Sequence, residues 1–387
     1  MEFFTESYSG RPIRKVCYHS GTHVPTSSVT NVAGVSGTLL SCWSRLKTLL
    51  TEIFLPQGYP SSVSDDYMQY QRWDTLQAFA SSLTGALATE AVLKGAGVGD
   101  QSASTLAASL TWLTKDGLGM IGRSELDYDC KKWRFVADIF NDLAFFIDLI
   151  SPALSGSFFV CACTSSILRS VVGVAGGATR TAIVQHQARR NNLADVASKD
   201  GSQETVVNIS ALLVSLIMLP LVSGKLAFIF TFTHLYANYQ AVRSLNMETM
   251  NQKRAFMLIR SWLSCGKILS VRECNIAEPL FSSFGKRYLG CSLFDLLSYH
   301  RRVPSSRLVM KDSYTLLFDT SRNIGWIAMA DGGCNYSALN ALFDLETLAK
   351  KDTPSNDFII FMDELRKHGW EVNISNLGFD EWAYSTK

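Results

Sequence analysis

Apolar residues recur at three- and four-residue intervals through much of the first two thirds of the chain, as they do along one face of a helix. The first run of this kind contains Trp73, Leu76, Ala80, Leu83, Leu87 and Ala91. Residues 104–114 and 131–152 follow the same interval, and the second of these runs carries polar residues on its opposite face. The pattern therefore predicts several helices, and the abundance of Gly, Ala, Ser and Thr between the larger side chains favours close packing among them.

Two windows of about 20 residues carry no charge and approach the length that a membrane-spanning helix needs. They are Leu149 to Leu168 and Thr205 to Gly224. Lys225 and a further uncharged stretch follow the second window, and Pro220 and Gly224 would kink or break a helix there. One kinked span and a hairpin of two short helices both fit this pattern.

A polar block separates the two windows, and it is too rich in charge to face lipid. Asp200 followed by Gln203 resembles a capping box, which predicts that a helix begins there with Glu204 in its first turn. Asp195 and Lys199 are spaced to pair on a helix surface. The block is either an interfacial connector or a polar seam that faces protein or a cavity. The candidate seam residues are Arg180, Arg189, Arg190, Asn191, Asn192, Asp195, Lys199, Asp200 and Glu204.

Small residues precede this block. Gly173 and Gly177 form a GxxxG spacing with Gly176 between them. Such spacing lets two helices approach closely within a membrane, because glycine has no side chain to hold the backbones apart. These three glycines are therefore predicted to form a helix-packing surface.

The last third of the chain has the pattern of a small α+β domain in water. Alternating apolar residues over 314–318 and 324–328 flank the turn sequence TSRN, which predicts a β-hairpin. A helix is expected from Ser337, a second one from Pro354 to just before Gly369, and a final strand over 370–374.

Composition narrows the possible functions. The 387 residues include 36 Lys+Arg and 34 Asp+Glu, a formal charge of +2 that gives no electrostatic argument for a nucleic-acid partner. Nine cysteines without paired CxxC spacing indicate reduced thiols rather than a disulfide framework. The first residues lack the apolar core of a secretory signal. Residues 1–49, rich in Ser and Thr, fit a flexible segment, with an organellar transit segment as the alternative.

The motifs that resemble chemistry are weak. Gly117 to Gly122 read GLGMIG and satisfy GxGxxG, but a helix-like run precedes them where a dinucleotide site needs a strand. Asp138 and Asp142 share a helix face, and Arg134 is spaced to pair with the first of them. His186 and His234 have no ligand-spaced neighbours. We therefore predict no catalytic residue, no metal site and no cofactor.

Several long strings carry a resemblance to a known family. They include FLPQGYPSSVSDDYMQYQRWDTLQAFASSLTGALATEAVLKGAGVG, TWLTKDGLGMIGR, KKWRFVADIFNDLAFFIDLISP and the stretch from Ser170 to Gly224. In this order they resemble the root UVB sensitive (RUS) family, particularly its animal-type members, over roughly residues 54–280. The matching positions are Pro56, Gly58, Tyr59, Pro60, Lys115, Asp116, Gly117 and the block from Gly176 to Glu204.

The resemblance implies a membrane protein without an established enzymatic activity. The family is associated in plants with root UV-B responses, early seedling development and vitamin B6 homeostasis, and some members act as pairs. No catalytic residues are defined for it. One departure stands out, because Arg123 runs directly into SELDYD where relatives continue with a short aromatic, apolar segment.

Taken together, these patterns predict a mainly α protein with a helical, membrane-associated domain over 50–265 and a small α+β domain over 280–387. The leading function is a non-enzymatic membrane scaffold or regulator that assembles with a protein partner, such as another RUS-type protein. The alternative is a small-solute carrier or binding protein, with a B6-type ligand implied only by the family. The expected location is a membrane, with a plastid or mitochondrion as possible organelles.

Overall fold

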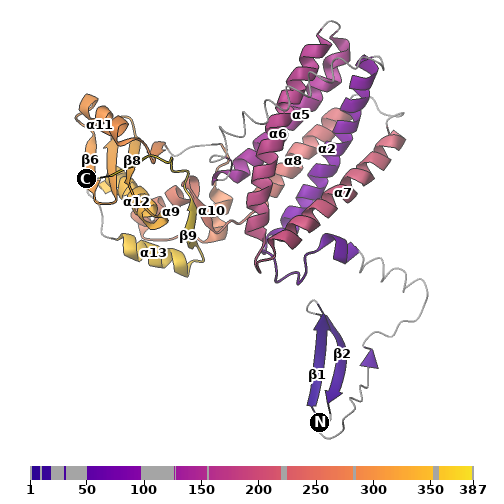
Figure 1. Cartoon of the computed structure of the whole chain (residues 1–387), viewed down its shortest axis with the longest axis horizontal. Helices are drawn as coiled ribbons and strands as arrows, with labels where there is room; N and C mark the ends of the chain where they lie inside the picture. The colour runs from indigo at the N-terminus through magenta and orange to yellow at the C-terminus, as the bar shows by residue number, and fades with distance from the viewer. Residues whose placement is uncertain are drawn as a thin grey trace. The chain divides into compact units, whose positions relative to one another are not determined.

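The computed structural model describes residues 2–8, 11–18, 30–31, 50–96, 126, 128–154, 157–218, 225–281, 285–351 and 357–385. The chain, whose helices and strands are labelled in Figure 1, divides into two compact units. Met1–Glu90 and Ile183–Ala237 form the first, and Ala91–Ala182 and Asn238–Lys387 form the second. Helices α6 (Phe158–Gln187) and α8 (Lys225–Ser244) each contribute residues to both units.

Within the first unit, the helical part consists of α2 (Tyr67–Ala96) as far as Glu90, α7 (Leu193–Met218), the end of α6 and the beginning of α8. The unit also holds an antiparallel sheet of β1 (Glu2–Tyr8), β2 (Arg11–Tyr18) and β3 (Thr30–Asn31). These strands were not predicted from the sequence, which indicated a flexible segment over residues 1–49.

Two predicted boundaries in the apolar region are wrong. Helix α7 begins at Leu193, so Asp200 lies inside the helix, where it is buried and hydrogen-bonded by a side chain of α2 instead of capping a terminus. The uncharged window from Leu149 to Leu168 is not one helix. Helix α5 (Cys130–Ile150) ends there, a 3-10 turn containing Pro152 follows, and α6 begins at Phe158. Proline cannot donate the hydrogen bond that a continuing helix requires.

Within the described residues, the uncharged stretch after Glu204 contributes the second half of α7, which extends to Met218, and most of α8, which begins at Lys225. Residues 219–224, where the sequence left a kink or a hairpin open, lie outside the described residues. The GLGMIG motif and the helix predicted over 104–114 lie outside the described residues.

In the helical part of the second unit, α5 packs against α6. The contact is made by Ala137 and Trp133 from α5, Ala175 and its neighbours from α6, and Leu126. Arg169 of α6 forms an ion pair with the buried carboxylate of Asp148 on α5. Asp138, one of the paired acids noted in the sequence, accepts a hydrogen bond from the Asn238 side chain.

The rest of the second unit is an α+β fold. Its elements are β4 (Thr249–Asn251), α9 (Gln252–Cys265), α10 (Val271–Ala277), β5 (Lys286–Leu289), α11 (Leu293–Arg302), β6 (Arg307–Lys311), β7 (Tyr314–Asp319), β8 (Ile324–Ala330), α12 (Asn335–Lys351), α13 (Phe358–Lys367), β9 (Glu371–Asn376) and β10 (Ala383–Tyr384). The predicted hairpin is confirmed as the antiparallel pair β7–β8. Strand β6 continues the sheet beside β7, while β5 and β10 run parallel to β8 along its other edge.

Two apolar clusters hold this fold together. The larger joins α12, α13 and α9 to one set of strand side chains that includes Leu316 and Ile327. The smaller joins Leu296 of α11 to Leu317 and Ala328, which alternate with the first set along β7 and β8. Because successive side chains of a strand point to opposite faces, the two clusters cover the two faces of the sheet.

Candidate functional site

The polar block identified in the sequence lies in the first unit, at the turn between α6 and α7. The segment before α2, residues 54–66, pairs with this turn through its backbone. Val63 forms an antiparallel bridge with Ala188. The Arg189 amide donates to the Ser62 carbonyl at 3.1 Å, and the Ser64 amide donates to the Gln187 carbonyl at 3.0 Å. We call residues 54–66 the pre-α2 segment.

Apolar side chains reinforce this pairing. Val63 and Tyr67 pack against Val184 of α6 and Val196 of α7, so three parts of the chain meet in one small core. Asn191 stands in the turn with a φ of 54°, a left-handed conformation that asparagine tolerates better than most residues.

Several predicted seam residues are held by the pre-α2 segment and its neighbour Glu52. Arg190 donates through Nη2 to the Ser61 hydroxyl at 2.7 Å. Asn192 donates to the Ser62 carbonyl at 3.1 Å. On α7, Asp195 accepts a hydrogen bond from the Gln57 amide at 2.7 Å, and Lys199 donates to the Glu52 carbonyl. Asp195 and Lys199, which the sequence predicted as a pair, thus each contact a distant part of the chain.

Of the remaining seam candidates, Arg189 joins the pre-α2 segment through its backbone amide, and Asp200 is buried beside Gln71 of α2. Arg189 and Asn191 have exposed side chains at the turn, and Glu204 is exposed on α7. Arg180 belongs to the part of α6 that lies in the other unit. The hydrogen bonds given above for Arg190, Asn192 and Asp195 are centred on the contact between the pre-α2 segment and the start of α7.

Sequence reasoning missed a set of buried polar contacts beside this turn. His186 Nε2 lies 2.9 Å from an Asp66 carboxylate oxygen, and the Ser64 hydroxyl donates to the other oxygen at 2.5 Å. Gln71 of α2 donates to Asp200 of α7 at 3.4 Å. The His186–Asp66 and Gln71–Asp200 pairs each join residues more than a hundred positions apart, so local spacing in the sequence could not have predicted them.

Polar contacts continue further along the helices. Gln203 of α7 donates to the Gln71 carbonyl at 3.2 Å and also to the Thr75 hydroxyl. On α8, the fully buried His234 lies 2.9 Å from the side-chain oxygen of Gln77. The interior of this unit thus contains amides, imidazoles and carboxylates at several levels.

Four buried polar atoms in this region have no hydrogen-bond partner within the described part of the chain. They are Ser62 Oγ, Tyr67 Oη, Gln71 Oε1 and Gln187 Nε2. Burial and the nearby Asp200 carboxylate raise the pKa of the Tyr67 hydroxyl above its ordinary value, so this group remains a neutral donor. Because buried polar groups are rarely left unpaired, these atoms indicate bonding capacity for water or a small polar molecule.

The outer surface of the same unit has the opposite character. Large apolar side chains are exposed on α7 and α8, several of them by more than half of their surface. They are Ile209, Leu212, Leu213, Leu216, Ile217, Phe228, Ile229 and Phe232. By length and composition, two described helices, over Val160–Gln187 and Leu193–Met218, meet the requirements for a membrane span, and only 17% and 22% of their apolar windows are buried.

The three glycines of α6 lie where a side chain would meet open space. A Cβ atom placed at Gly173, Gly176 or Gly177 has no heavy atom within 4 Å among the described residues. The described chain therefore leaves this surface uncovered, and its expected role in helix packing stays a prediction.

A second buried polar cluster lies in the second unit. Lys131, at the start of α5, donates to the Leu245 carbonyl and the Asn275 side chain, and its Nζ lies 3.2 Å from a Glu278 carboxylate oxygen. Arg254 lies 3.6 Å from the other oxygen of Glu278. Burial alone would raise the pKa of Glu278, but the charges of Arg254 and Lys131 outweigh it and lower the pKa to about 2. This cluster joins α5 to α9 and α10.

Among the described residues, no group of three or more His, Cys, Asp or Glu side chains is arranged to hold a metal ion.

Comparison with known proteins gives consistent matches. The family model described as "Vitamin B6 photo-protection and homoeostasis domain" matches residues 41–266. RUS family member 1 of Dictyostelium discoideum is 44% identical over 258 residues, which cover 62% of this chain and 49% of that protein. Protein root UVB sensitive 3 of Arabidopsis thaliana is 37% identical, with coverage of 62% and 58%.

Root UVB sensitive 2, chloroplastic, also of Arabidopsis thaliana, is 29% identical over 59% of this chain and 55% of its own length. The chain thus spans about half the length of the curated relatives that it matches. No solved structure matches it. Since the family model covers more than half of the residues and includes the whole pre-α2 segment and the α6–α7 turn, the chain belongs to the root UVB sensitive (RUS) family.

Proposed function

We propose that this chain is a non-enzymatic RUS protein embedded in a membrane, where it acts as a scaffold or regulator by assembling with a protein partner through its helices. The observation that carries the proposal is the polarity of the first unit. Its interior holds Asp66, Gln71, Asp200 and His234, whereas α7 and α8 present large apolar side chains outward.

This arrangement is the reverse of that in a water-soluble protein, which buries apolar side chains and exposes polar ones. Soluble monomers rarely expose contiguous apolar surface of this extent, and such a surface marks contact with lipid or another protein. In lipid, the exposed apolar side chains of α7 are already in a favourable solvent, and polar groups are stable only when they face other protein groups.

The charges along α7 agree with this placement. Asp195, Lys199, Asp200 and Glu204 all lie in the first half of the helix, and the described residues from Thr205 to its end carry no charge. The charged half is held by the pre-α2 segment. The uncharged half is therefore the part proposed to enter lipid.

The glycines of α6 support assembly with a partner. Gly173, Gly176 and Gly177 leave a surface on which no described residue lies within reach of an added Cβ. Small residues at this spacing allow a second helix to approach closely in a membrane. Another RUS-type protein is the partner that the family association favours.

Alkaline carbonate extraction tests the membrane placement. The wild-type chain, expressed in cells, should stay in the membrane pellet. A variant with Leu212→Arg and Leu213→Arg should be released or degraded, because each arginine at the centre of a span costs about 2.5 to 3.5 kcal/mol on insertion scales. A matched variant with Ser198→Arg and Ser202→Arg on the charged half should behave like the wild type. Release of the wild-type chain into the wash would contradict the proposal.

A second function is favoured by the unpartnered buried atoms. Ser62, Tyr67, Gln71 and Gln187 offer hydrogen-bonding capacity inside the first unit, which supports a small-solute carrier or binding protein. The family description names vitamin B6, so B6 vitamers are the ligands to test first.

Thermal-shift and uptake assays with pyridoxine, pyridoxal and pyridoxamine separate the two functions. A vitamer that raises the melting temperature of the wild type but not of a Gln71→Leu, Gln187→Leu variant would support the binder. Replacement of Arg189 and Arg190 by alanine tests whether the exposed arginines take part. Identical responses of all three proteins would leave the scaffold as the remaining proposal.

A further inference from the structure

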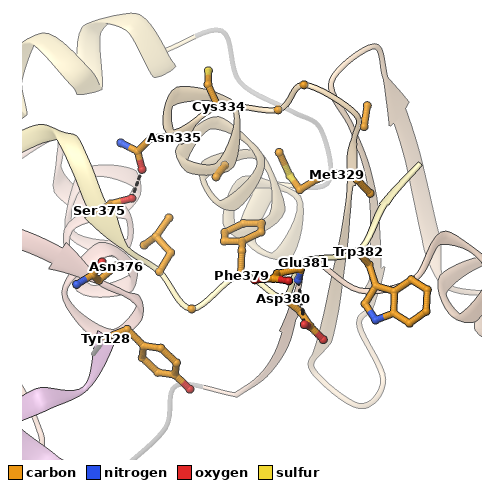
Figure 2. Close-up of a pocket in the computed structure, with 17 residues that line it drawn as sticks. Tyr128, Met329, Cys334, Asn335, Ser375, Asn376, Phe379, Asp380, Glu381 and Trp382 are labelled. Carbon is orange, nitrogen blue, oxygen red and sulfur yellow. Dashed lines mark hydrogen bonds between the residues drawn. The ribbon is translucent and has the colours of Figure 1, made fainter. Parts of the chain in front are cut away.

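An open cavity of about 510 Å³ lies in the α+β part of the second unit. The end of β8, the residues at the start of α12 and the loop between β9 and β10 form its walls (Figure 2). Its volume falls within the range of about 300 to 1,000 Å³ that is usual for small-molecule sites. Apart from Tyr128, its lining lies outside the segment matched by the family model.

The loop between β9 and β10 is fixed by close backbone contacts. Gly290 has a φ of +71°, and a Cβ there would lie 2.2 Å from the Asp380 carbonyl oxygen. The Asp380 amide donates to the Leu289 carbonyl at 2.9 Å. At Gly378, which also has a positive φ, a Cβ would lie 2.6 Å from the Tyr128 ring. This wall of the cavity is therefore formed before any ligand binds, which limits the entropy that binding must overcome.

The charges of the lining all have one sign. Among the 17 lining residues, Asp380 and Glu381 are the charged side chains, and there is no Lys, Arg or His. Both carboxylates are exposed, and neither forms an ion pair with a described residue. The cavity therefore attracts cations and disfavours anions.

Aromatic rings stand beside these carboxylates. Phe379 lies between the α12 side of the cavity and Asp380 (Figure 2). Trp382 directly follows Glu381 in the chain. Trp382 is 60% exposed, so most of this large apolar side chain is not covered by the described residues. Aromatic faces attract ammonium groups, and their combination with carboxylates is a recurrent way to bind organic amines.

We propose that this cavity binds a small organic cation, an amine carried on an aromatic or apolar body. Asp380 and Glu381 neutralise the ammonium group, and the rings of Phe379 and Trp382 contact the body. The site is independent of the polar seam in the first unit and of the function proposed above.

Titration calorimetry on the full chain in detergent tests the proposal with tyramine as the probe. Its neutral analogue 4-ethylphenol and its anionic analogue 3-(4-hydroxyphenyl)propionate serve as matched ligands. Tyramine should bind at least about tenfold more tightly than 4-ethylphenol, and the anionic analogue should bind most weakly. Equal affinity for the three ligands would overturn the proposal.

Two variants locate the binding. Asp380→Asn with Glu381→Gln should reduce tyramine affinity to that of the neutral analogue, and Trp382→Ala should weaken both ligands. The control, Asp363→Asn with Glu364→Gln, removes a pair of acids from α13 that do not line the cavity and should leave tyramine affinity unchanged. Melting curves confirm that each variant is folded. Loss of affinity in the control, or none in the Asp380/Glu381 variant, would contradict the assignment.

A second readout is independent of affinity. Cys334 lines the cavity at the start of α12, and hydrogen bonding with Ser337 lowers the pKa of its thiol, which favours reaction with iodoacetamide. Tyramine should slow the alkylation of Cys334, measured by mass spectrometry, while exposed Cys265 on α9 reacts at an unchanged rate. An unchanged rate at Cys334 under saturating tyramine would place the amine elsewhere and overturn the proposal.

Discussion

His186, next to the last residue of α6, lies 2.9 Å from the carboxylate of Asp66, immediately before α2. The side chains of both residues are almost completely buried, and Ser64 donates to the second oxygen of the same carboxylate. The carboxylate thus links the pre-α2 segment to the helix that leads into the polar turn.

Replacement of Asp66 by alanine should destabilise the first unit. The change leaves both His186 and Ser64 without their acceptor, and a buried donor left unpaired costs about 1 to 3 kcal/mol. Thermal unfolding of the purified chain measures the effect. Asp65 provides the control, because it is the neighbouring acid and its side chain is exposed. Equal melting temperatures for Asp66→Ala and Asp65→Ala would show that the buried contact does not stabilise the fold.

Glu278 should make the stability of the second unit depend on pH at acidic values. Its pKa in the folded chain is about 2, below its ordinary value of 4.5, so the folded state favours the charged form. The corresponding stabilisation is complete above pH 4.5 and is lost as the pH falls from there towards 2.

Replacement of Glu278 by glutamine should remove that dependence. It leaves Lys131 and Arg254 buried without a counter-charge, and loss of one partner of a buried pair costs about 3 to 5 kcal/mol. Denaturant unfolding between pH 7 and pH 3 measures both effects, with Glu381→Gln at an exposed position as the control. An unchanged pH profile in the Glu278 variant would contradict the assignment.

Bulky residues at the α6 glycines should weaken assembly with a partner without destabilising the fold. A Cβ added at Gly176 or Gly177 has no described heavy atom within 4 Å, and leucine has a higher helix propensity than glycine by about 1 kcal/mol. The melting temperature should therefore be maintained, while chemical crosslinking in membranes should yield less of the complex with a partner. Alanine at both positions should have a smaller effect. If the leucine variant is crosslinked to the partner as fully as the wild type, this surface is not part of the interface.

The loop beside the C-terminal cavity should tolerate no side chain at Gly378. Alanine there must adopt a φ of +69° and also displace the Tyr128 ring. At Gly369 alanine meets the same kind of strain, with a φ of +81°, but no neighbour within 4 Å. Gly378→Ala should therefore lower the melting temperature more than Gly369→Ala, because only the first substitution adds a steric clash to the backbone strain. Equal shifts would indicate that Tyr128 moves away at little cost.

Short-range patterns were sufficient for most helices and for the β7–β8 hairpin. The apolar intervals of α2 and α5 are visible in the sequence because each helix has a packed side, and the alternation around TSRN marks the side chains, Leu316 among them, that pack in the larger cluster. That the opposite face is also covered, by the smaller cluster, is seen only in the structure. The break between α5 and α6 could have been predicted from Pro152, which the uncharged window conceals.

The candidate site was harder to predict, because its contacts join distant positions. Asp200 has the local spacing of a helix cap, yet its carboxylate accepts a hydrogen bond from Gln71, 129 residues earlier. Asn192 and Ser62 are 130 residues apart. The polar block itself was recognised, but nothing in it specifies that the pre-α2 segment covers it, and Asp66 and His186 carry no motif that would mark them as partners.

The uncharged half of α7 is proposed to lie in lipid. Spin labels attached to single cysteines at Leu213 and at Ser198, in an otherwise cysteine-free chain reconstituted in liposomes, test it through their collision rates with oxygen and with a water-soluble nickel complex. If the uncharged half does lie in lipid, collisions with oxygen should dominate at position 213 and collisions with the nickel complex at position 198. Dominance of the nickel complex at both positions would show that α7 lies in water and would contradict the proposed membrane placement.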